Sequence, residues 1–570
     1  MTEKDLQKEI ADLKTQIRKL KKNNLGLVFE DKPEDVVTDC QENIPVLKEV
    51  KAKRIVSNDE NPNNILIEGD NYHSLSVLNY THKKKIDLIY IDPPYNTGAS
   101  VWKYNNDYVD KEDAYRHSKW LSLMRHRLNI AKDLLKDDGF FVCAIDHNEL
   151  FTLGVLLDKI FGEENRLGIV SVVHQARGRW MDKNFSASNE FMLVYSKTKG
   201  TNIRNIVIDP EKKEKFILQD EKGLYYLKNY IVVQGGGGGV TRKDKPNFWY
   251  PIYVSKDLKK ISLEKKGGYE KVLPITDSGR ELTWITIPET FLERFNDGEV
   301  EIKREKGKIV IYRKFREQQI IPTHWVDSRY NATSHGTLLL EKILGKNIFD
   351  YPKSLYLLVD ILKLTTKQDS IVLDFFAGSG TTGHAVLELN KEDGGSRKFI
   401  LCTNNENNNG NGSGGIAESV CYPRIKNVIK GYKDKKNEKV AGLGGNLSYY
   451  QTDLVNIEKI HKIPDEAKIR VTYQAGEMIA VREDTLNEVE KNDWWQIFEG
   501  KDKLTAIYFK EDKAKLAELI AKLEKKNLPT ALYIFSWGKN EYKGEYSSAN
   551  IRVEDIPEPI IEVYKELNRL

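Results

Sequence analysis

Short apolar runs alternate with amphipathic segments between residues 61 and 199. Apolar runs of this length bounded by polar residues predict buried strands, and apolar residues spaced three and four apart predict helices. The expected strands are 63–70, 85–92, 139–146, 167–174 and 190–197, and the expected helices are 71–81, 117–135 and 149–161. Strands that alternate with helices imply an α/β fold with a mostly parallel sheet covered on both faces.

The same rhythm returns after residue 350 and is absent between about 200 and 335. A helix over 351–366, a strand over 370–376, a helix over 381–390 and a strand over 397–403 are expected. The intervening region carries a five-glycine run in "QGGGGGVTRKDKPNFWYP" (234–251), which glycine makes flexible. After about residue 445 a small α/β unit is expected, with strands near 477–483, 504–510 and 530–538 and a helix at 511–526.

The first segment of the chain has the spacing of a coiled coil. Leu6, Ile10, Leu13, Ile17 and Leu20 are separated by alternating steps of four and three residues. Isoleucine and leucine in this alternation favour a parallel two-stranded coiled coil, but the seam is short, so a helix packed on its own domain is an equal alternative.

Composition narrows the class of protein. A chain of 570 residues has room for roughly three or four folded units. Its four cysteines have no C-x-x-C spacing, so we expect neither disulfides nor a metal site, and a cytoplasmic location. No leader or apolar run of about 18 residues is present, so no membrane association is expected. The net charge is only +4, yet residues 201–330 hold 25 Lys+Arg against 19 Asp+Glu, so a polyanion would meet a local surface.

A glycine-rich turn, "LDFFAGSGTTGHA" (373–385), follows an expected strand and opens an expected helix. Its glycines fit the G-x-G-x-x-G pattern of dinucleotide sites, with Glu406 placed as a ribose ligand. However, Asp374 lies directly before Phe375 and Phe376, and an acid there disfavours a pyrophosphate. A carboxylate and aromatic faces suit the sulfonium of S-adenosylmethionine, which we therefore expect as the cofactor.

The segment "IDPPYNTG" (91–98) ends another expected strand. The exocyclic amine of adenine is a poor nucleophile because its lone pair is delocalised, and an enzyme activates it by accepting both N–H bonds. Asp92 supplies one acceptor, and the Pro93 carbonyl, stiffened by Pro93 and Pro94, supplies the other. Tyr95 offers a face on which a base flipped out of the duplex can stack.

These motifs together carry a family resemblance. "DPPY" paired with "FAGSG" resembles the amino-methylating DNA methyltransferases; the aspartate is similar to adenine-N6 enzymes, and the motif order resembles the β class. Segments 26–37, 63–98, 117–139, 351–358 and 372–395 resemble the Mod (modification) subunit of type III restriction-modification systems over most of 25–435. The chain departs from that pattern at His147, Ser354 and 402–407.

The resemblance implies a Rossmann-like, seven-stranded methyltransferase sheet with permuted motif order. Residues 370–376, 397–403, 63–70, 85–92 and 139–146 would be strands one to five, so strands one and four adjoin where the strand order reverses and ligands bind. The implied domains are an N-terminal helix and possible dimer coiled coil (1–24), the catalytic half (25–199), a target-recognition domain (200–335), the cofactor-binding half (336–440) and a C-terminal α/β domain (445–570).

The resemblance also assigns the site. Catalytic roles fall on Asp92, Pro93, Pro94 and Tyr95, and cofactor contacts on Asp70, Asn71, Lys353, Asp374, Phe375, Phe376, Ala377, Gly378, Ser379, Gly380, Thr381 and Glu406. Four of these have alternatives that stay open. Asp70 contacts the cofactor or caps the helix at Asn71, Ser379 and Thr381 bond the cofactor or cap the next helix, and Lys353 lies over the cofactor or is a surface cation.

We therefore expect a site-specific DNA adenine-N6 methyltransferase that uses S-adenosylmethionine and acts on double-stranded DNA. A homodimer is expected, either as the modification subunit of a type III system or as a solitary relative. No G-x-x-x-x-G-K-[ST] motif occurs, so restriction would need a separate helicase-nuclease subunit. The alternatives are an NAD-dependent oxidoreductase and a catalytically inactive DNA-binding scaffold.

Overall fold

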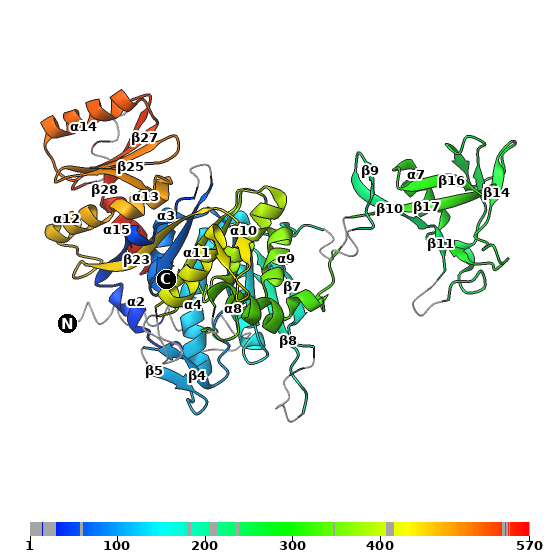
Figure 1. Cartoon of the computed structure of the whole chain (residues 1–570), viewed down its shortest axis with the longest axis horizontal. Coiled ribbons are helices and arrows are strands. Elements are labelled where there is room, and N and C mark those ends of the chain that lie inside the picture. The colour runs from blue at the N-terminus through cyan, green and yellow to red at the C-terminus, as the bar shows by residue number, and fades with distance from the viewer. Residues whose placement is uncertain are drawn as a thin grey trace. The chain divides into compact units, whose positions relative to one another are not determined.

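The computed structural model describes two compact units, shown in Figure 1: Met1–Arg204 with Pro322–Leu570, and Asn205–Ile321. The described residues are 14, 30–57, 61–105, 107–176, 178, 184–205, 214–233, 239–317, 320–345, 348–405, 415–538, 542, 545–546 and 548–568. The expected N-terminal helix, apart from Lys14, and Glu406 lie outside them.

A ten-stranded sheet forms the centre of the larger unit, in the order β1-β23-β2-β20-β19-β3-β6-β8-β7-β18. In that order the strands are Asn43–Glu49, Asn446–Asn456, Asn63–Glu68, Lys398–Thr403, Ile371–Asp374, Ile86–Ile91, Leu135–Ile145, Asn189–Ser196, Arg166–Val173 and His324–Trp325. The strands from β23 to β6 are mutually parallel, whereas β8 runs antiparallel to both β6 and β7.

All seven strands expected for this sheet are present, and they are contiguous from β2 to β7. The sheet has ten strands where the sequence predicted seven, because β1 and β23 extend one edge and β18 extends the other. β19 pairs with β3, with Leu373 opposite Ile89, so the expected strands one and four do lie side by side. The carboxyl ends of these two strands, where the chain continues into Asp92 and the glycine turn, are therefore neighbours.

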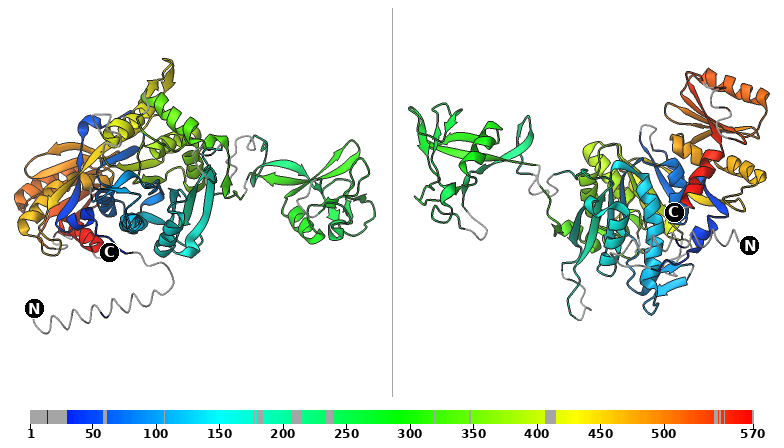
Figure 2. Two further views of the ribbon diagram at one scale, coloured as in Figure 1. Left: turned by 90° about the horizontal axis from the view of Figure 1, so that it is seen from below. Right: turned by 180° about the vertical axis from the view of Figure 1, so that it is seen from behind.

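Helices cover both faces of this sheet (Figure 2). They include α2 (Asp35–Asp39), α3 (Asn71–Thr81), α4 (Arg116–Leu134), α5 (Leu150–Phe161), α8 (Leu338–Leu344), α9 (Leu355–Thr365), α10 (Thr381–Asp393) and α11 (Tyr422–Lys430). Side chains of α3, α4 and α5 share one buried cluster with Ile65, Ile67, Ile89 and Ile91. Burial on both faces explains why these strands are almost continuously apolar. Two hairpins, β4 (Ala99–Tyr104) with β5 (Asp107–Asp110) and β21 (Gly431–Lys433) with β22 (Lys439–Ala441), lie outside the sheet.

The C-terminal part of the chain contributes to two sheets. Strand β23 belongs to the large sheet, and a second sheet has the order β24-β25-β26-β27-β28. Its elements are α12 (Asp465–Gln474), α13 (Gly476–Glu483), β24 (Asn487–Lys491), β25 (Trp495–Glu499), β26 (Leu504–Tyr508), α14 (Lys513–Lys526), β27 (Thr530–Phe535), β28 (Ile551–Ile556) and α15 (Glu558–Leu567). One face packs on α14, and the other shares the cluster that contains α3. The strand expected near 477–483 is wrong, because these residues belong to helix α13. An apolar run this short does not distinguish the period of a strand from the period of a helix.

The smaller unit has its own core of aromatic and aliphatic side chains, among them Tyr230, Tyr250, Trp284 and Phe291. Its elements are β9 (Leu218–Asp220), β10 (Gly223–Asn229), β11 (Ile231–Val232), β12 (Ile252–Val254), β13 (Ile261–Ser262), β14 (Glu270–Val272), β15 (Thr283–Trp284), α7 (Pro288–Asn296), β16 (Val300–Glu305) and β17 (Lys308–Arg316). The glycine run lies, except for Gly239, outside the described residues. No helix in the described part of either unit is both long and apolar enough to cross a membrane.

Candidate active site

Buried polar contacts fix the position of the loop that follows β3. Trp120 of α4 is fully buried and donates its indole N–H to the Pro94 carbonyl at 2.7 Å. Asn96 is also buried, adopts a positive φ of 54°, and donates to Glu149 Oε1 at 2.5 Å. Side chains of the core thus fix the backbone of the Asp-Pro-Pro-Tyr segment before any ligand binds, which is the preorganisation a catalytic site requires.

Asp92 lies in a compact charged cluster with Tyr95, Glu190 and Lys353. Lys353 Nζ is 2.7 Å from Asp92 Oδ2 and 3.3 Å from Glu190 Oε2. The ammonium also donates to the Tyr95 hydroxyl at 2.6 Å, and that hydroxyl donates to Glu190 Oε2 at 2.9 Å. Only 12% of the Lys353 side chain is exposed, so Lys353 is not a surface cation. Its contacts are with the catalytic acid expected from the sequence.

Two carboxylate oxygens in this cluster are buried without a hydrogen-bond partner among the described residues, Asp92 Oδ1 and Glu190 Oε1. Burial raises the pKa of Asp92, Lys353 opposes the shift, and Glu190 adds to it. Burial alone would lower the pKa of Lys353, but the two carboxylates outweigh it and raise that pKa. An unpaired buried acceptor costs about 1–3 kcal/mol, and an N–H donor on a ligand would remove that cost.

The glycine turn after β19 is organised by Asp374. Its Oδ1 accepts the Phe376 N–H at 3.0 Å, and its Oδ2 accepts the Thr382 hydroxyl at 2.5 Å. Burial raises the pKa of Asp374 to about 7. Gly378 and Gly380 have φ values of +48° and +77°, a region that side chains other than glycine rarely adopt. Asp374 therefore shapes the turn with both oxygens.

Ser379 and Thr381 point to a buried arginine. Arg424 of α11 is fully buried and donates to the Ser379 hydroxyl at 3.0 Å and to the Thr381 hydroxyl at 2.7 Å. Burial lowers the pKa of Arg424 to about 10. Neither hydroxyl caps α10, whose N-cap residue is Gly380 with no side-chain capping bond. The capping alternative for these two residues is therefore wrong, and both hydroxyls help to fix the turn.

Asp70 and Asn71 join the end of β2 to the glycine turn. Asp70 is the N-cap of α3 and accepts the Tyr72 N–H at 2.7 Å, so it does cap the helix. Its side chain is still 41% exposed. Asn71 donates to the Phe375 carbonyl at 3.1 Å, although β20 lies between the two strands. The turn and the β2 end are thereby held in a fixed relation.

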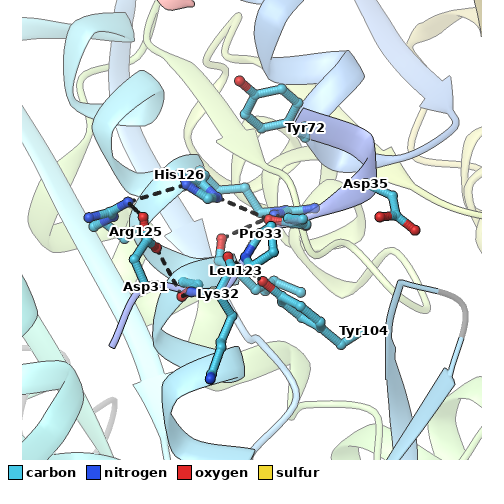
Figure 3. Close-up of polar contacts among 12 residues, drawn as sticks. Asp31, Lys32, Pro33, Asp35, Tyr72, Tyr104, Leu123, Arg125 and His126 are labelled. Atoms are coloured by element: carbon cyan, nitrogen blue, oxygen red, sulfur yellow. Dashed lines mark hydrogen bonds and ion pairs between the residues drawn. The ribbon is translucent and has the colours of Figure 1, made fainter. Parts of the chain in front are cut away.

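A segment of the chain that we call the strap, residues 30–35, packs along α4 (Figure 3). Asp31 pairs with Arg125 at 2.5 Å, and Glu34 contacts His126 at 3.1 Å. Arg127, only 2% exposed, lies 2.7 Å from Glu34 and 3.2 Å from Asp70. Arg127 also donates to the side-chain oxygen of Asn71. Ion pairs and hydrogen bonds through Arg127 thus connect the strap to Asp70 and Asn71.

The charges of this edge of the sheet fit a cationic ligand. The carboxylates of Glu34, Asp70, Asp92 and Glu190 outnumber their cationic partners, Arg127 and Lys353. Phe375 is buried in the core and Phe376 is only partly buried, with their ring centroids 5.3 Å apart. A carboxylate surplus and aromatic faces suit a sulfonium and an ammonium, whereas a pyrophosphate would face uncompensated acids.

The structure brings together Asp92, Tyr95 and Lys353, and separately links Asn71 to Phe375. Sequence reasoning missed Glu190, Arg127 and Arg424. Glu190 is near the start of an antiparallel strand, so it lies at the edge where parallel strands end. An acid at the beginning of the expected strand 190–197 was the signal for it, usable only with the strand direction known. For the two arginines, the only signal was a cation within an otherwise buried helix face.

The protein has an open α/β sheet. Where the strand order of this sheet reverses, an acid-proline-proline-tyrosine loop lies beside a glycine turn, and carboxylates surround both segments. These features together define a methyltransferase that uses S-adenosylmethionine. The model of a family described as DNA methylase matches residues 86–410, and the chain belongs to this family. It is a DNA methyltransferase with S-adenosylmethionine as its cofactor, as the sequence predicted, and the oxidoreductase alternative is wrong.

Curated relatives support the same class. The type II methyltransferase M.KpnI of Klebsiella pneumoniae is 35% identical over 59% of this chain and 79% of the relative. The EcoPI Mod subunit of Escherichia phage P1 is 33% identical over 63% of this chain and 60% of the relative. The StyLTI Mod subunit of Salmonella typhimurium is also 33% identical, over 63% and 55%. The resemblance to type III Mod subunits is confirmed, although the match spans less than two thirds of either Mod subunit.

Among solved structures, the PvuII DNA methyltransferase (cytosine-N4-specific) has 14% identity and a TM-score of 0.32, covering 65% of this chain and 97% of that one.

Proposed function

We propose that this protein transfers a methyl group to N6 of an adenine that is flipped out of double-stranded DNA. The observation that carries the proposal is the Oδ1 of Asp92, which is buried and has no hydrogen-bond partner within the described part of the chain, at the end of β3 beside the glycine turn. An oxygen in this state accepts an N–H bond, and the amino group of adenine presents two. An extruded base is required because the target atom is unreachable within a duplex.

Each residue of the loop has a distinct task in this proposal. Asp92 Oδ1 accepts one N6–H, and the carbonyl of Pro93, whose φ is fixed by its ring, accepts the other. Bound S-adenosylmethionine supplies an electrophilic methyl carbon. As N6 becomes cationic, Asp92 stabilises the charge and then takes the released proton on Oδ1. The raised pKa of Asp92, caused first by burial, suits it to that role.

The residues that would hold the cofactor lie around the glycine turn. Asp70, Asn71, Phe376 and the backbone from Ala377 to Gly380 would form the wall of carboxylate, aromatic and glycine groups that a sulfonium and an amino acid moiety require. Phe375, which is buried in the core, would support this wall. Asp374, Ser379 and Thr381 would act by shaping the turn, since each is bonded within the protein. Glu406, as a ribose ligand, stays a prediction outside the described residues.

We assign DNA recognition to the smaller unit, Asn205–Ile321, which has its own core and interrupts the methyltransferase chain. The net positive charge of this region would allow its surface to contact the phosphates of DNA. A homodimer through the N-terminal helix, and a separate restriction subunit, remain part of the proposal. The type II and type III names among the relatives are consistent with an enzyme that methylates alone or beside such a subunit.

The proposal is tested by Asp92→Asn. Loss of the anionic acceptor is expected to lower methyl transfer to DNA about 100-fold or more, the scale seen when one transition-state donor or acceptor is removed. S-adenosylmethionine affinity, measured by calorimetry, is expected to stay within about threefold. Asp107→Asn, at the exposed start of β5, is the matched control and should be fully active. An active Asp92→Asn variant would contradict the proposal, and an inactive wild type would favour the scaffold alternative.

A further inference from the structure

Two carboxylates and one ammonium meet at the catalytic loop from three distant parts of the chain. Asp92 follows β3, Glu190 lies in β8, and Lys353 precedes α9. Strand β6 separates β3 from β8 in the sheet, so the carboxylates are not neighbours through strand pairing. Lys353 joins them, at 2.7 Å from Asp92 Oδ2 and 3.3 Å from Glu190 Oε2. The arrangement therefore depends on this one side chain.

The contacts divide the oxygens of Asp92 into two kinds. Oδ2 faces the ammonium, whereas Oδ1 is buried and has no partner among the described residues. Glu190 Oε2 accepts the Tyr95 hydroxyl and also faces Lys353, so Glu190 fixes both of these side chains. Partial rotation of the Asp92 carboxylate would break the ion pair, whereas a half turn only exchanges its two equivalent oxygens. The ion pair thus fixes the plane of the carboxylate and leaves one oxygen for a ligand.

We propose that Lys353 and Glu190 are positioning residues: Lys353 keeps the Asp92 carboxylate charged, and the two together direct its Oδ1 at the amine to be methylated. This inference rests on the proposed function and deepens it. It gives Lys353 a role at the catalytic acid in place of the cofactor contact expected from the sequence. Glu190 acts through Lys353 and Tyr95, because its carboxylate anchors both.

The electrostatics around Asp92 make the role of Lys353 specific. The groups that act on Asp92, or on which it acts, are Lys353, Glu190 and Tyr95, with Tyr90 of β3, Cys143 of β6 and Asp374 of β19. Lys353 is the one cation in this set. Without it, Asp92 would face Glu190 and Asp374 in a buried site, and neighbouring carboxylates do not readily share charge. Removal of Glu190 has the opposite effect, because it removes a negative neighbour.

The experiment measures the single-turnover rate of methyl transfer between pH 5.5 and 9 for the full chain. With Lys353→Met, the acidic limb of the profile is expected to move up by one pH unit or more, so that the rate at pH values on that limb falls about tenfold and recovers at high pH. With Glu190→Gln, the limb is expected to move down while the plateau falls severalfold. In the double variant, the acidic limb should lie between the limbs of the two single variants. Opposite displacements of the acidic limb in the two single variants are not expected if these residues merely support the fold.

Two binding measurements separate positioning from cofactor binding. S-adenosylmethionine affinity by calorimetry, and the fluorescence of 2-aminopurine at the target position as a report of base extrusion, are both expected to change less than threefold in Lys353→Met. Lys363→Met is the matched control, since Lys363 lies on α9 and pairs with Glu392 on the surface. It should match the wild type in every measurement. Lys353→Arg, which keeps the charge, should leave the acidic limb in place.

An unmoved acidic limb in both Lys353→Met and Glu190→Gln would overturn the inference, and so would a tenfold loss of S-adenosylmethionine affinity in Lys353→Met. If Lys353→Met does not fold, the downward shift in Glu190→Gln remains the test. If the wild type methylates adenine but the acidic limb is unmoved in both variants, this inference alone is rejected. No adenine methylation by the wild type rejects the proposed function as well.

Discussion

At the scale of single residues, the site is governed by acids whose burial disfavours their charge. Asp374 is the clearest case, because its pKa is raised from 3.8 to about 7 by burial in the glycine turn. The folded state therefore binds this proton more tightly than the unfolded state does. The resulting stabilisation is complete below pH 4 and is lost as the pH rises through 7, a difference of about 4 kcal/mol in the free energy of unfolding.

Asp374→Asn should remove this pH dependence. Its free energy of unfolding is expected to gain relative to the wild type as the pH rises from 5 to 8, because the amide never acquires the buried charge. Parallel urea unfolding of both proteins at four pH values measures the difference, and other titrating groups cancel. A constant difference across that range would show that the Asp374 carboxyl titrates near its ordinary pKa.

At the scale of elements, the strap and α4 hold the end of β2 through Arg127. Two contacts on the same helix differ sharply in burial. Arg127 is 2% exposed and pairs with Glu34 at 6%, whereas Arg125 is 39% exposed and pairs with Asp31 at 51%. Removing one partner of a buried pair leaves an uncompensated charge, whereas an exposed pair is screened by water.

Arg127→Met is therefore expected to lower the free energy of unfolding by about 3–5 kcal/mol, and Arg125→Met by less than about 1 kcal/mol. Urea unfolding of the two variants provides the comparison. S-adenosylmethionine affinity should also fall in Arg127→Met, since Asp70 and Asn71 lose their shared donor. Equal stability of the two variants would contradict the role given to the strap.

At the scale of the whole molecule, local sequence determined what could be foreseen. Most of the seven expected strands were predictable because apolar runs covered on both faces are distinctive, although β7 has only one buried residue. The pairing of β1 with β23 was not, because it joins Ile44 to Val455 across most of the chain. The same limit applies at the site. Asp92 and the glycine turn adjoin strand ends and were visible in sequence, whereas Glu190 required the direction of β8, and Arg424 required the packing of α11.

The two units have separate cores, which predicts separable functions. Replacing residues 205–321 by a short glycine-serine linker should leave a protein that binds S-adenosylmethionine with about wild-type affinity but no longer methylates DNA at a defined sequence. Calorimetry and methylation of a plasmid followed by sequencing measure the two properties. Retained sequence specificity in the shortened protein would remove DNA recognition from the smaller unit.

The central claim is that Asp92 activates the amine of adenine, and the nature of the methylated nucleoside tests it most directly. DNA incubated with the purified protein and S-adenosylmethionine would be digested to nucleosides and analysed by mass spectrometry. N6-methyldeoxyadenosine with the wild type, and none with Asp92→Asn, is the expected result. N4-methyldeoxycytidine in its place, or N6-methyldeoxyadenosine formed equally well by Asp92→Asn, would contradict the account.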